Sequence, residues 1–151
     1  MVRIKHRYIV GQILFDPNVE VQEGTQGRDI VSAIREKVQI LYGDVGLGEF
    51  GVSTVIKYYD QSGIDSSTQL FVIRTAREAV DNLLFVMSNI TTIRKNTVVL
   101  RSLDVCGSVR TCMASMRNLI GIAVDASHAM DNDAKEAKKK RLVGILEDTL
   151  E

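Results

Sequence analysis

The first half of the chain changes its hydrophobic period twice, and each period predicts one kind of element. Residues 7–15 have apolar side chains at both odd-numbered and even-numbered positions, which indicates a central strand covered on two faces. After a polar loop, Gly43 is a natural C-terminal stop for a helix. The helix itself is predicted by one stripe of apolar positions: Ile30, Ile34, Val38 and Leu41.

Two further strand patterns and a second helix follow. Residues 53–60 and 68–75 are rich in β-branched and aromatic residues, and the turn-like segment 61–67 between them predicts a hairpin. Thr75 and Glu78 have the spacing of a capping box, which opens a helix. Its apolar stripe is Val80, Leu83, Leu84, Met87 and Ile90.

The last part of the pattern adds a fourth strand and a third helix. Residues 96–106 are aliphatic and β-branched, as strands are, and Ser108 is a suitable N-cap. The helix after it has one apolar face: Val109, Cys112, Met113, Met116, Leu119, Ile120 and Ala123.

The resulting order, β-α-β-β-α-β and one more helix, predicts an α+β fold. It is the ferredoxin-like split βαβ pattern, an antiparallel sheet with two helices on one face. We expect the C-terminal helix to cover part of the second face. Residues 1–125 form this domain, and residues 126–151 are a polar tail in which a solvated segment and a helix remain alternatives, with Leu142, Leu146 and Leu150 as its apolar positions.

Composition narrows the class of protein. With 45% hydrophobic and 25% charged residues, the 151-residue chain is typical of a globular domain. Two cysteines and no secretory signal favour a reducing compartment, and no apolar run approaches the roughly 18 residues of a membrane helix. The formal net charge is zero, but residues 1–7 carry three cations and no acid, and residues 74–117 carry seven cations against three acids.

Motifs for other chemistries fail on context. Residues 46–51, GLGEFG, match the dinucleotide fingerprint in letters, but a helix precedes them and a strand follows, which is the reverse of what the fingerprint needs. The spacing of the cysteines and histidines fits no zinc site, and no nucleophile with a neighbouring base is apparent. We expect no catalytic residue, no metal site and no cofactor of the chain's own.

Two segments favour phosphate binding. Arg3, Lys5 and Arg7 fall on one side of an extended backbone, with Tyr8 beside them. In residues 104–112, Gly107 leads into a helix start with Arg110 in its first turn, where an arginine opposes the helix dipole unless an anion is present. Alternatively, the first segment is a solubilising arm, and Arg110 pairs with Asp104.

An RRM-type interface is excluded on similar grounds. The strand of residues 68–75 has only Phe71 as an aromatic residue and lacks the RNP1 pattern. A helix over the second face would also block base stacking on the sheet. RNA would therefore be held by its backbone and its shape.

Four segments taken together carry a family resemblance. MVRIKHRY at the start, GLGEFG before VIKYYD, VIRTAREAV, and LDVCGSVRTC resemble, in order and spacing, the Pop-five type of the Rpp-fourteen/Pop-five family of ribonuclease P and ribonuclease MRP subunits. The resemblance spans about residues 1–125, and the members of that family have the ferredoxin-like fold. The neutral overall charge and the tail after Asp125 depart from the family pattern.

The resemblance implies a non-catalytic subunit that braces a catalytic RNA during removal of the 5′ leader from precursor tRNA, and during rRNA processing. Its implied partners are ribonuclease P RNA and MRP RNA, the barrel-shaped ribonuclease P protein, other Pop and Rpp proteins and, indirectly, precursor tRNA, with no membrane. Mg²⁺ is expected at the RNA component. If the chain is eukaryotic, its expected location is the nucleus and nucleolus. The residues implied in RNA contact are Arg3, Lys5, Arg7, Tyr8, Lys57, Arg74, Arg77, Gly107 and Arg110.

Two other classes of function remain open at this point. One is a ferredoxin-like regulatory module that binds a small anionic ligand at Arg110. The other is a protein–protein adaptor without RNA contact. Salt separates them, because binding through several phosphates weakens steeply with log salt, whereas apolar pairing does not.

Overall fold

The computed structural model describes residues 4–18, 24–60, 69–126 and 131–150. Its sheet has five strands: β1 (His6–Phe15), β2 (Val55–Tyr59), β3 (Leu70–Ala76), β4 (Thr92–Ile93) and β5 (Asn96–Cys106). Their spatial order is β2-β3-β1-β5-β4, and all neighbours are antiparallel. Without the short β4, which the sequence pattern did not predict, this is the ferredoxin-like order, so the predicted fold class is confirmed.

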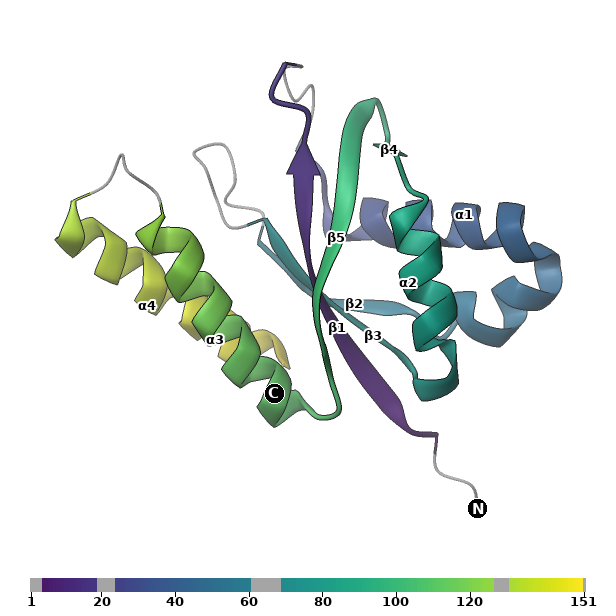
Figure 1. Ribbon diagram of the computed structural model, residues 1–151. Helices are drawn as coiled ribbons and strands as arrows, with labels where there is room; N and C mark the ends of the chain where they lie inside the picture. The colour runs from purple at the N-terminus through teal and green to yellow at the C-terminus, as the bar shows by residue number, and fades with distance from the viewer. Residues whose placement is uncertain (1–3, 19–23, 61–68, 127–130, 151) are drawn as a thin grey trace.

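Helices cover both faces of the sheet (Figure 1). On one face lie α1 (Gly27–Gly46), α2 (Val80–Ser88) and the short helical turns η1 (Leu47–Gly51) and η2 (Arg77–Ala79). On the other lie α3 (Val109–Asp125) and α4 (Asn132–Leu150). Within the described residues no helix is long and apolar enough to cross a membrane.

Alternation along the central strand builds two separate cores. Ile9 and Ile13 of β1 are buried against α1 and α2, whereas Val10 is buried against α3 and α4. Both faces are therefore apolar, as predicted from the apolar residues at both odd-numbered and even-numbered positions of residues 7–15. Because α3 and α4 close the second face, base stacking on the sheet in the RRM manner is blocked there.

The polar tail forms α4, so the structure shows the helical alternative. Leu142, Leu146 and Leu150 recur every four residues, and their side chains are only 2%, 0% and 8% exposed. Burying side chains of this type contributes roughly 1.5–3 kcal/mol each. Such burial explains why a segment with so many lysines holds a fixed place against α3 and β2.

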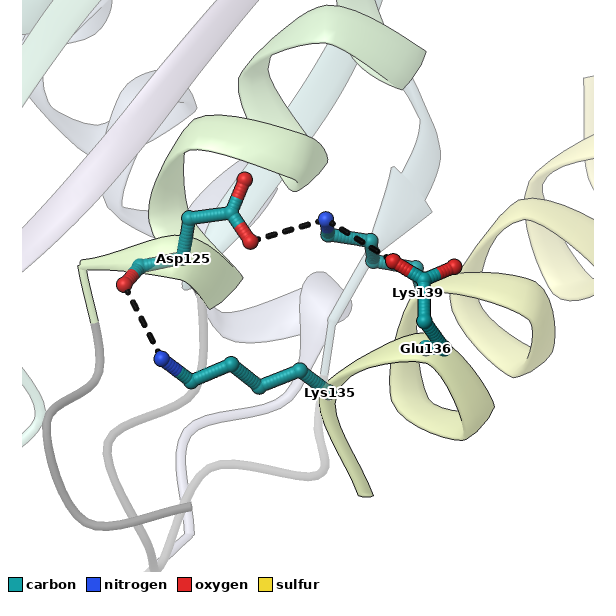
Figure 2. A network of polar contacts seen from close by, with 4 residues as sticks. All are labelled: Asp125, Lys135, Glu136 and Lys139. Carbon is teal, nitrogen blue, oxygen red and sulfur yellow. Dashed lines mark hydrogen bonds and ion pairs between the residues drawn. The ribbon is translucent and has the colours of Figure 1, made fainter. Parts of the chain in front are cut away.

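Polar contacts fasten the start of α4 to the end of α3, as Figure 2 shows. The Lys139 ammonium lies 2.8 Å from the Asp125 carboxylate and 3.3 Å from that of Glu136. Lys135 donates to the backbone carbonyl of Asp125 over 3.2 Å. The tail thus contributes two lysines, Lys135 and Lys139, to the α3–α4 contact.

Two local expectations are wrong. Thr75 does not cap α2: its side chain is fully buried in β3, where its hydroxyl lies 3.3 Å from that of Thr54, and the helix begins at η2 without a side-chain cap. Leu41 does not join the buried stripe of α1 but is 41% exposed. In both cases the contacts of the folded sheet and corner outweigh the local pattern.

Candidate functional site

One cleft joins the two segments that the sequence singled out separately. Its volume is about 400 Å³. In the sheet, Tyr8 of β1 pairs with Cys106 of β5. Because the two strands are antiparallel, the residues before Tyr8 and those after Cys106 run side by side beyond this pair. Together they line the cleft: Ile4, Lys5, His6, Arg7, Tyr8, Gly107, Ser108 and Val109.

The start of α3 forms one wall of the cleft. Ser108 is its N-cap, as predicted, and accepts a hydrogen bond from the Thr111 amide over 3.3 Å. The Thr111 hydroxyl accepts in return from the Ser108 amide over 3.2 Å, which completes a capping box. The amides of Val109 and Arg110, at the first two helical positions, have no partner within a helix, so the positive end of the helix dipole lies at the cleft.

Arg7 forms the opposite wall. Its Nη1 donates to the carbonyl of His6 over 3.0 Å, which holds the guanidinium near the backbone. The guanidinium carbon lies 4.0 Å from the place where a Cβ would stand at Gly107. A fixed cation and a helix N-terminus thus lie side by side, which is an arrangement that attracts anions.

Two arginines, one in β3 and one in η2, lie close to this cleft without lining it. The Arg77 amide donates to the carbonyl of Lys5 over 2.8 Å, and the Arg77 side chain is exposed. Arg74 is the cross-strand neighbour of Tyr8. Its side chain is half-buried, and its Nε is buried without a hydrogen-bond partner.

Lys5, Arg7 and Arg110 form no ion pair with any other described residue. Among the described residues the ion pairs are Arg94–Asp29, Arg117–Glu147, Lys139–Asp125 and Lys139–Glu136. None of them includes Lys5, Arg7 or Arg110. Positive charge at the cleft is therefore available to a ligand.

Asp104, the alternative partner of Arg110, is engaged elsewhere. Its carboxylate accepts from the Ser115 hydroxyl over 2.6 Å and from the Val105 amide over 2.8 Å. The Ser115 hydrogen bond is the main reason that the pKa of this carboxyl lies below its usual value. The described contacts thus contain no Arg110–Asp104 pair, and Arg110 stays exposed in the first turn of α3.

The predicted contact residues are brought together only in part. Lys5, Arg7, Tyr8 and Gly107 line the cleft. Lys57 does not, since it lies on β2 with all of β3 between it and β1. Arg3 lies outside the described residues.

Ile4, His6, Ser108 and Val109 also line the cleft, although none of them is among the residues that the resemblance implied in RNA contact. The only signal for them in the sequence is that each adjoins a residue that was singled out. Which residues face one cleft depends on strand pairing, and that is not visible in the sequence.

The GLGEFG corner is closely packed at its first and last glycines, Gly46 and Gly51. Gly43 has φ +65° and breaks α1, as a C-terminal stop should, but the chain remains helical through η1 to Gly51. The Phe50 ring fills the corner and meets Tyr42 edge-on, with 5.2 Å between ring centroids. The described structure thus has α1 before this motif and β2 after it, as expected, which is the wrong order for a dinucleotide site.

Within the described residues, no group of three or more histidine, cysteine or acidic side chains could hold a metal. Cys106 and Cys112 are both free and buried. Burial, as the largest cause, raises the pKa of Cys106 to about 11 and that of Cys112 to about 12. Neither thiol is therefore activated as a nucleophile at neutral pH.

Known proteins share both this sequence pattern and this fold. A probable ribonuclease P/MRP protein subunit POP5 of Arabidopsis thaliana is 27% identical over 117 residues, which cover 74% of each chain. A chain in the cryo-EM structure of yeast ribonuclease MRP has a TM-score of 0.56 over 98% of this chain and 93% of its own, and at 13% identity that likeness shows the fold alone. Residues 7–117 match the model of the Rpp14/Pop5 family, and the chain therefore belongs to that family.

Proposed function

We propose that this chain is an accessory protein subunit of ribonuclease P, and of ribonuclease MRP as a second particle. Its role is to brace the RNA, and the catalyst is the RNA. Family membership over residues 7–117 supports this proposal. The Arabidopsis relative is named as a probable ribonuclease P/MRP protein subunit, which agrees with it. The structural observation that supports RNA contact by this chain is the cleft between Lys5–Tyr8 and Gly107–Val109.

In this proposal the cleft holds backbone phosphates. The amides at the start of α3 donate to phosphate oxygens, and Arg7 and Lys5 supply the opposite charge. Arg77 and Arg110, which flank the cleft and are exposed, extend the contact along the strand of RNA. Contacts of this kind fix the position of an RNA without reading its sequence, which is what a bracing subunit requires.

Lys57 and Arg3 enter the proposal on other grounds. Lys57 matches the family pattern but stands on β2, so any contact it makes is a separate one from the cleft. Arg3 precedes the described start of the arm and is included because it continues the spacing of Lys5 and Arg7. Both are assigned here to the outer part of the RNA footprint.

Protein partners bind part of the apolar surface that remains exposed, at the end of α1. Ile40, Val45 and Val52, around the end of α1 and η1, are 67%, 74% and 65% exposed. Exposed apolar side chains that gather in one region are typical of interaction sites. We assign this corner to the other Pop and Rpp subunits, the barrel-shaped ribonuclease P protein among them.

Precursor tRNA is contacted indirectly, through the RNA, with 5′ leader removal and rRNA processing as the reactions served. Mg²⁺ acts at the RNA component. In a eukaryotic cell the particle, and this chain with it, resides in the nucleus and nucleolus.

The first experiment is purification of the tagged chain from its own cells under gentle conditions. The bound RNA is sequenced, and the eluate is assayed for cleavage of a precursor tRNA. We expect one structured RNA and cleavage that depends on it, so that nuclease treatment of the RNA abolishes activity. Mass spectrometry of the same eluate identifies the protein partners.

Either alternative class of function gives a different result. A ligand-binding module would elute without RNA or cleavage activity, and an adaptor would elute with protein partners but retain none of the RNA. Raising the salt during washing distinguishes direct from indirect RNA contact, because each phosphate contact contributes about 0.7–0.9 to the slope of log affinity against log salt. A slope near zero would contradict the cleft as the RNA site.

A further inference from the structure

The cleft lies where β5 ends and β1 continues. Pairing of β1 with β5 ends at Tyr8, opposite Cys106. Pairing of β1 with β3 continues further, to His6 opposite Ala76, so His6 and Arg7 have β3 beside them but no paired residue of β5. This open edge is too short for an added peptide strand, because strands usually have at least about three residues. The cleft therefore suits a ligand of another kind.

The lining of the cleft contains more than a phosphate requires. Beside the cations, His6 and Tyr8 contribute two aromatic rings. Ile4 and Val109 contribute two aliphatic side chains, and Ile4 is 64% exposed. A phosphate makes no favourable contact with an exposed aliphatic side chain or with the face of a ring. A ligand that is anionic at one end and flat and apolar at the other would contact both kinds of lining.

The two rings remain accessible although α3 and α4 cover this face of the sheet. His6 and Tyr8 are two residues apart on β1, so their side chains lie on the same face as that of Val10. Val10 is completely buried in the core under α3 and α4, whereas Tyr8 packs against that core only in part. Both ring residues are half-buried. They thus lie at the border of the covered face, and part of each ring is free for contact.

The charged and the flat parts of the lining belong to one small site. Arg7 lies between the two ring residues in the chain, and its guanidinium carbon is 4.0 Å from the place of a Cβ at Gly107. Val109, at the first position of α3, brings the free amides of the helix start to the same cleft. The volume of about 400 Å³ lies within the roughly 300–1,000 Å³ of pockets for small organic ligands. One phosphate group would fill only a small part of it.

We propose that the cleft binds one unpaired nucleotide of RNA, with its base against Tyr8 and Ile4 and its phosphate between Arg7 and the start of α3. The inference deepens the proposed function and rests on it. Inside an A-form helix the flat faces of the bases are hidden in the stack, so only a nucleotide of a loop, a bulge or a free end can enter. Because every base has a flat face, the cleft selects unpaired RNA without reading its sequence.

The test uses the purified full-length chain and three probes of about ten nucleotides each. The first is single-stranded oligouridine. The second has the same number of phosphates but carries abasic spacers in place of the nucleosides, and the third is an RNA duplex. Titration at one salt concentration gives the dissociation constants. We expect oligouridine to bind about fivefold or more tightly than the abasic probe, since only the first can stack on a ring.

Tyr8→Leu removes the ring but keeps an apolar side chain for the part that packs against the core. It should weaken binding of oligouridine about fivefold or more and leave binding of the abasic probe and of the duplex unchanged. Tyr8→Phe keeps the ring and should bind all three probes as the parent chain does. Phe85→Leu is a matched control, because Phe85 is a 53% exposed aromatic residue of α2, which lies on the opposite face.

Two further measurements keep the test decisive if Tyr8→Leu fails to fold. Ile4→Ala changes a largely exposed side chain and should also weaken binding of oligouridine alone, by a smaller factor. Photocrosslinking with an iodouridine-substituted probe needs no variant, and we expect the crosslinked peptide to contain Tyr8 or His6. Crosslinks confined to other elements would contradict the proposal.

The outcomes separate this proposal from the proposed function. Equal affinity of the parent chain for oligouridine and for the abasic probe would overturn base binding and leave the phosphate site in place. An equal loss for both probes in Tyr8→Leu would show that Tyr8 only supports the fold, which also overturns the proposal. Failure of the parent chain to bind any of the three probes would contradict the proposed function itself, and the proposal would fall with it.

Discussion

Two turns of this protein each contain a glycine next to a helix, but they differ in what surrounds that glycine. At residues 46–51 the chain leaves a helix, and at residues 106–108 it enters one. A methyl group at Gly46 would collide with the Cβ of Tyr42, whereas one at Gly107 would find Arg7 at 4.0 Å as its nearest neighbour. The first glycine allows close packing, and the second borders an open cleft.

The direction of the helix explains the difference. The end of α1 presents carbonyl groups and the negative end of its dipole, with Asp44 and Glu49 nearby, so an anion would be repelled. The start of α3 presents amides beside Arg7. A phosphate-binding motif is therefore defined by the polarity of the helix that adjoins it as much as by the glycines in it.

The largest expected effect is on RNA affinity at the open turn. Replacing Arg3, Lys5 and Arg7 with Ala should weaken RNA binding about tenfold or more and lower the salt slope by about 2–3, because up to three phosphate contacts are lost. Titration of the RNA at several salt concentrations measures both quantities, and circular dichroism checks the fold.

A matched control removes the same charge elsewhere. Lys95, Lys138 and Lys140 replaced by Ala change the net charge equally, but on the β4–β5 turn and on α4. This variant should keep most of the RNA affinity. An equal loss in both variants would mean that bulk charge, and not the cleft, holds the RNA.

The next effect is on stability at the packed turn. Gly46→Ala should lower the free energy of unfolding by about 1–2 kcal/mol, because the clash with Tyr42 exceeds the gain in helix propensity. Gly48→Ala, where no atom lies within 4 Å of the added group, should be neutral or stabilising. Urea unfolding compares the two, and a neutral Gly46→Ala would show that this corner is looser than its packing indicates.

A smaller effect is expected from the cap of α3. Ser108→Ala removes the hydroxyl that accepts from the Thr111 amide and should cost about 1 kcal/mol of stability. Gly107→Ala serves as its control and should change stability by less than about 0.5 kcal/mol, since the added methyl meets no close atom. Thermal unfolding followed by circular dichroism would reveal a reversed order, which would contradict the cap as the element that holds the cleft.

The smallest effect is on the pH dependence of stability. The pKa of Cys106 is raised from 9.0 to about 11, so the folded chain holds this proton more tightly than the unfolded chain. The resulting stability is complete below pH 9 and is lost as the pH rises toward 11, where the unfolded thiols ionise first. A Cys106→Ala, Cys112→Ala variant should therefore lose less stability than the parent between about pH 9 and about pH 11 under reducing conditions.

Much of the secondary structure followed from local pattern. The fold contains the central strand predicted from residues 7–15 and the strand predicted from residues 96–106. It also contains the predicted Ser108 cap. Thr75 misled the prediction, because its hydroxyl meets Thr54 on the neighbouring segment, and a capping pattern cannot reveal that contact. β4 was missed because a strand of two residues has no period of its own.

The sequence alone determined both halves of the cleft but not that they form one. The basic arm and the helix start are visible as separate segments about a hundred residues apart, since charge spacing and capping are local properties. Only the pairing of Tyr8 with Cys106 places them together. The strand order also places Lys57 on a strand away from the cleft. The second face of the sheet and α3 give the polar tail a surface on which its leucines are buried. Strand register and helix docking depend on the burial of side chains from the whole chain at once, so the tertiary structure decides them.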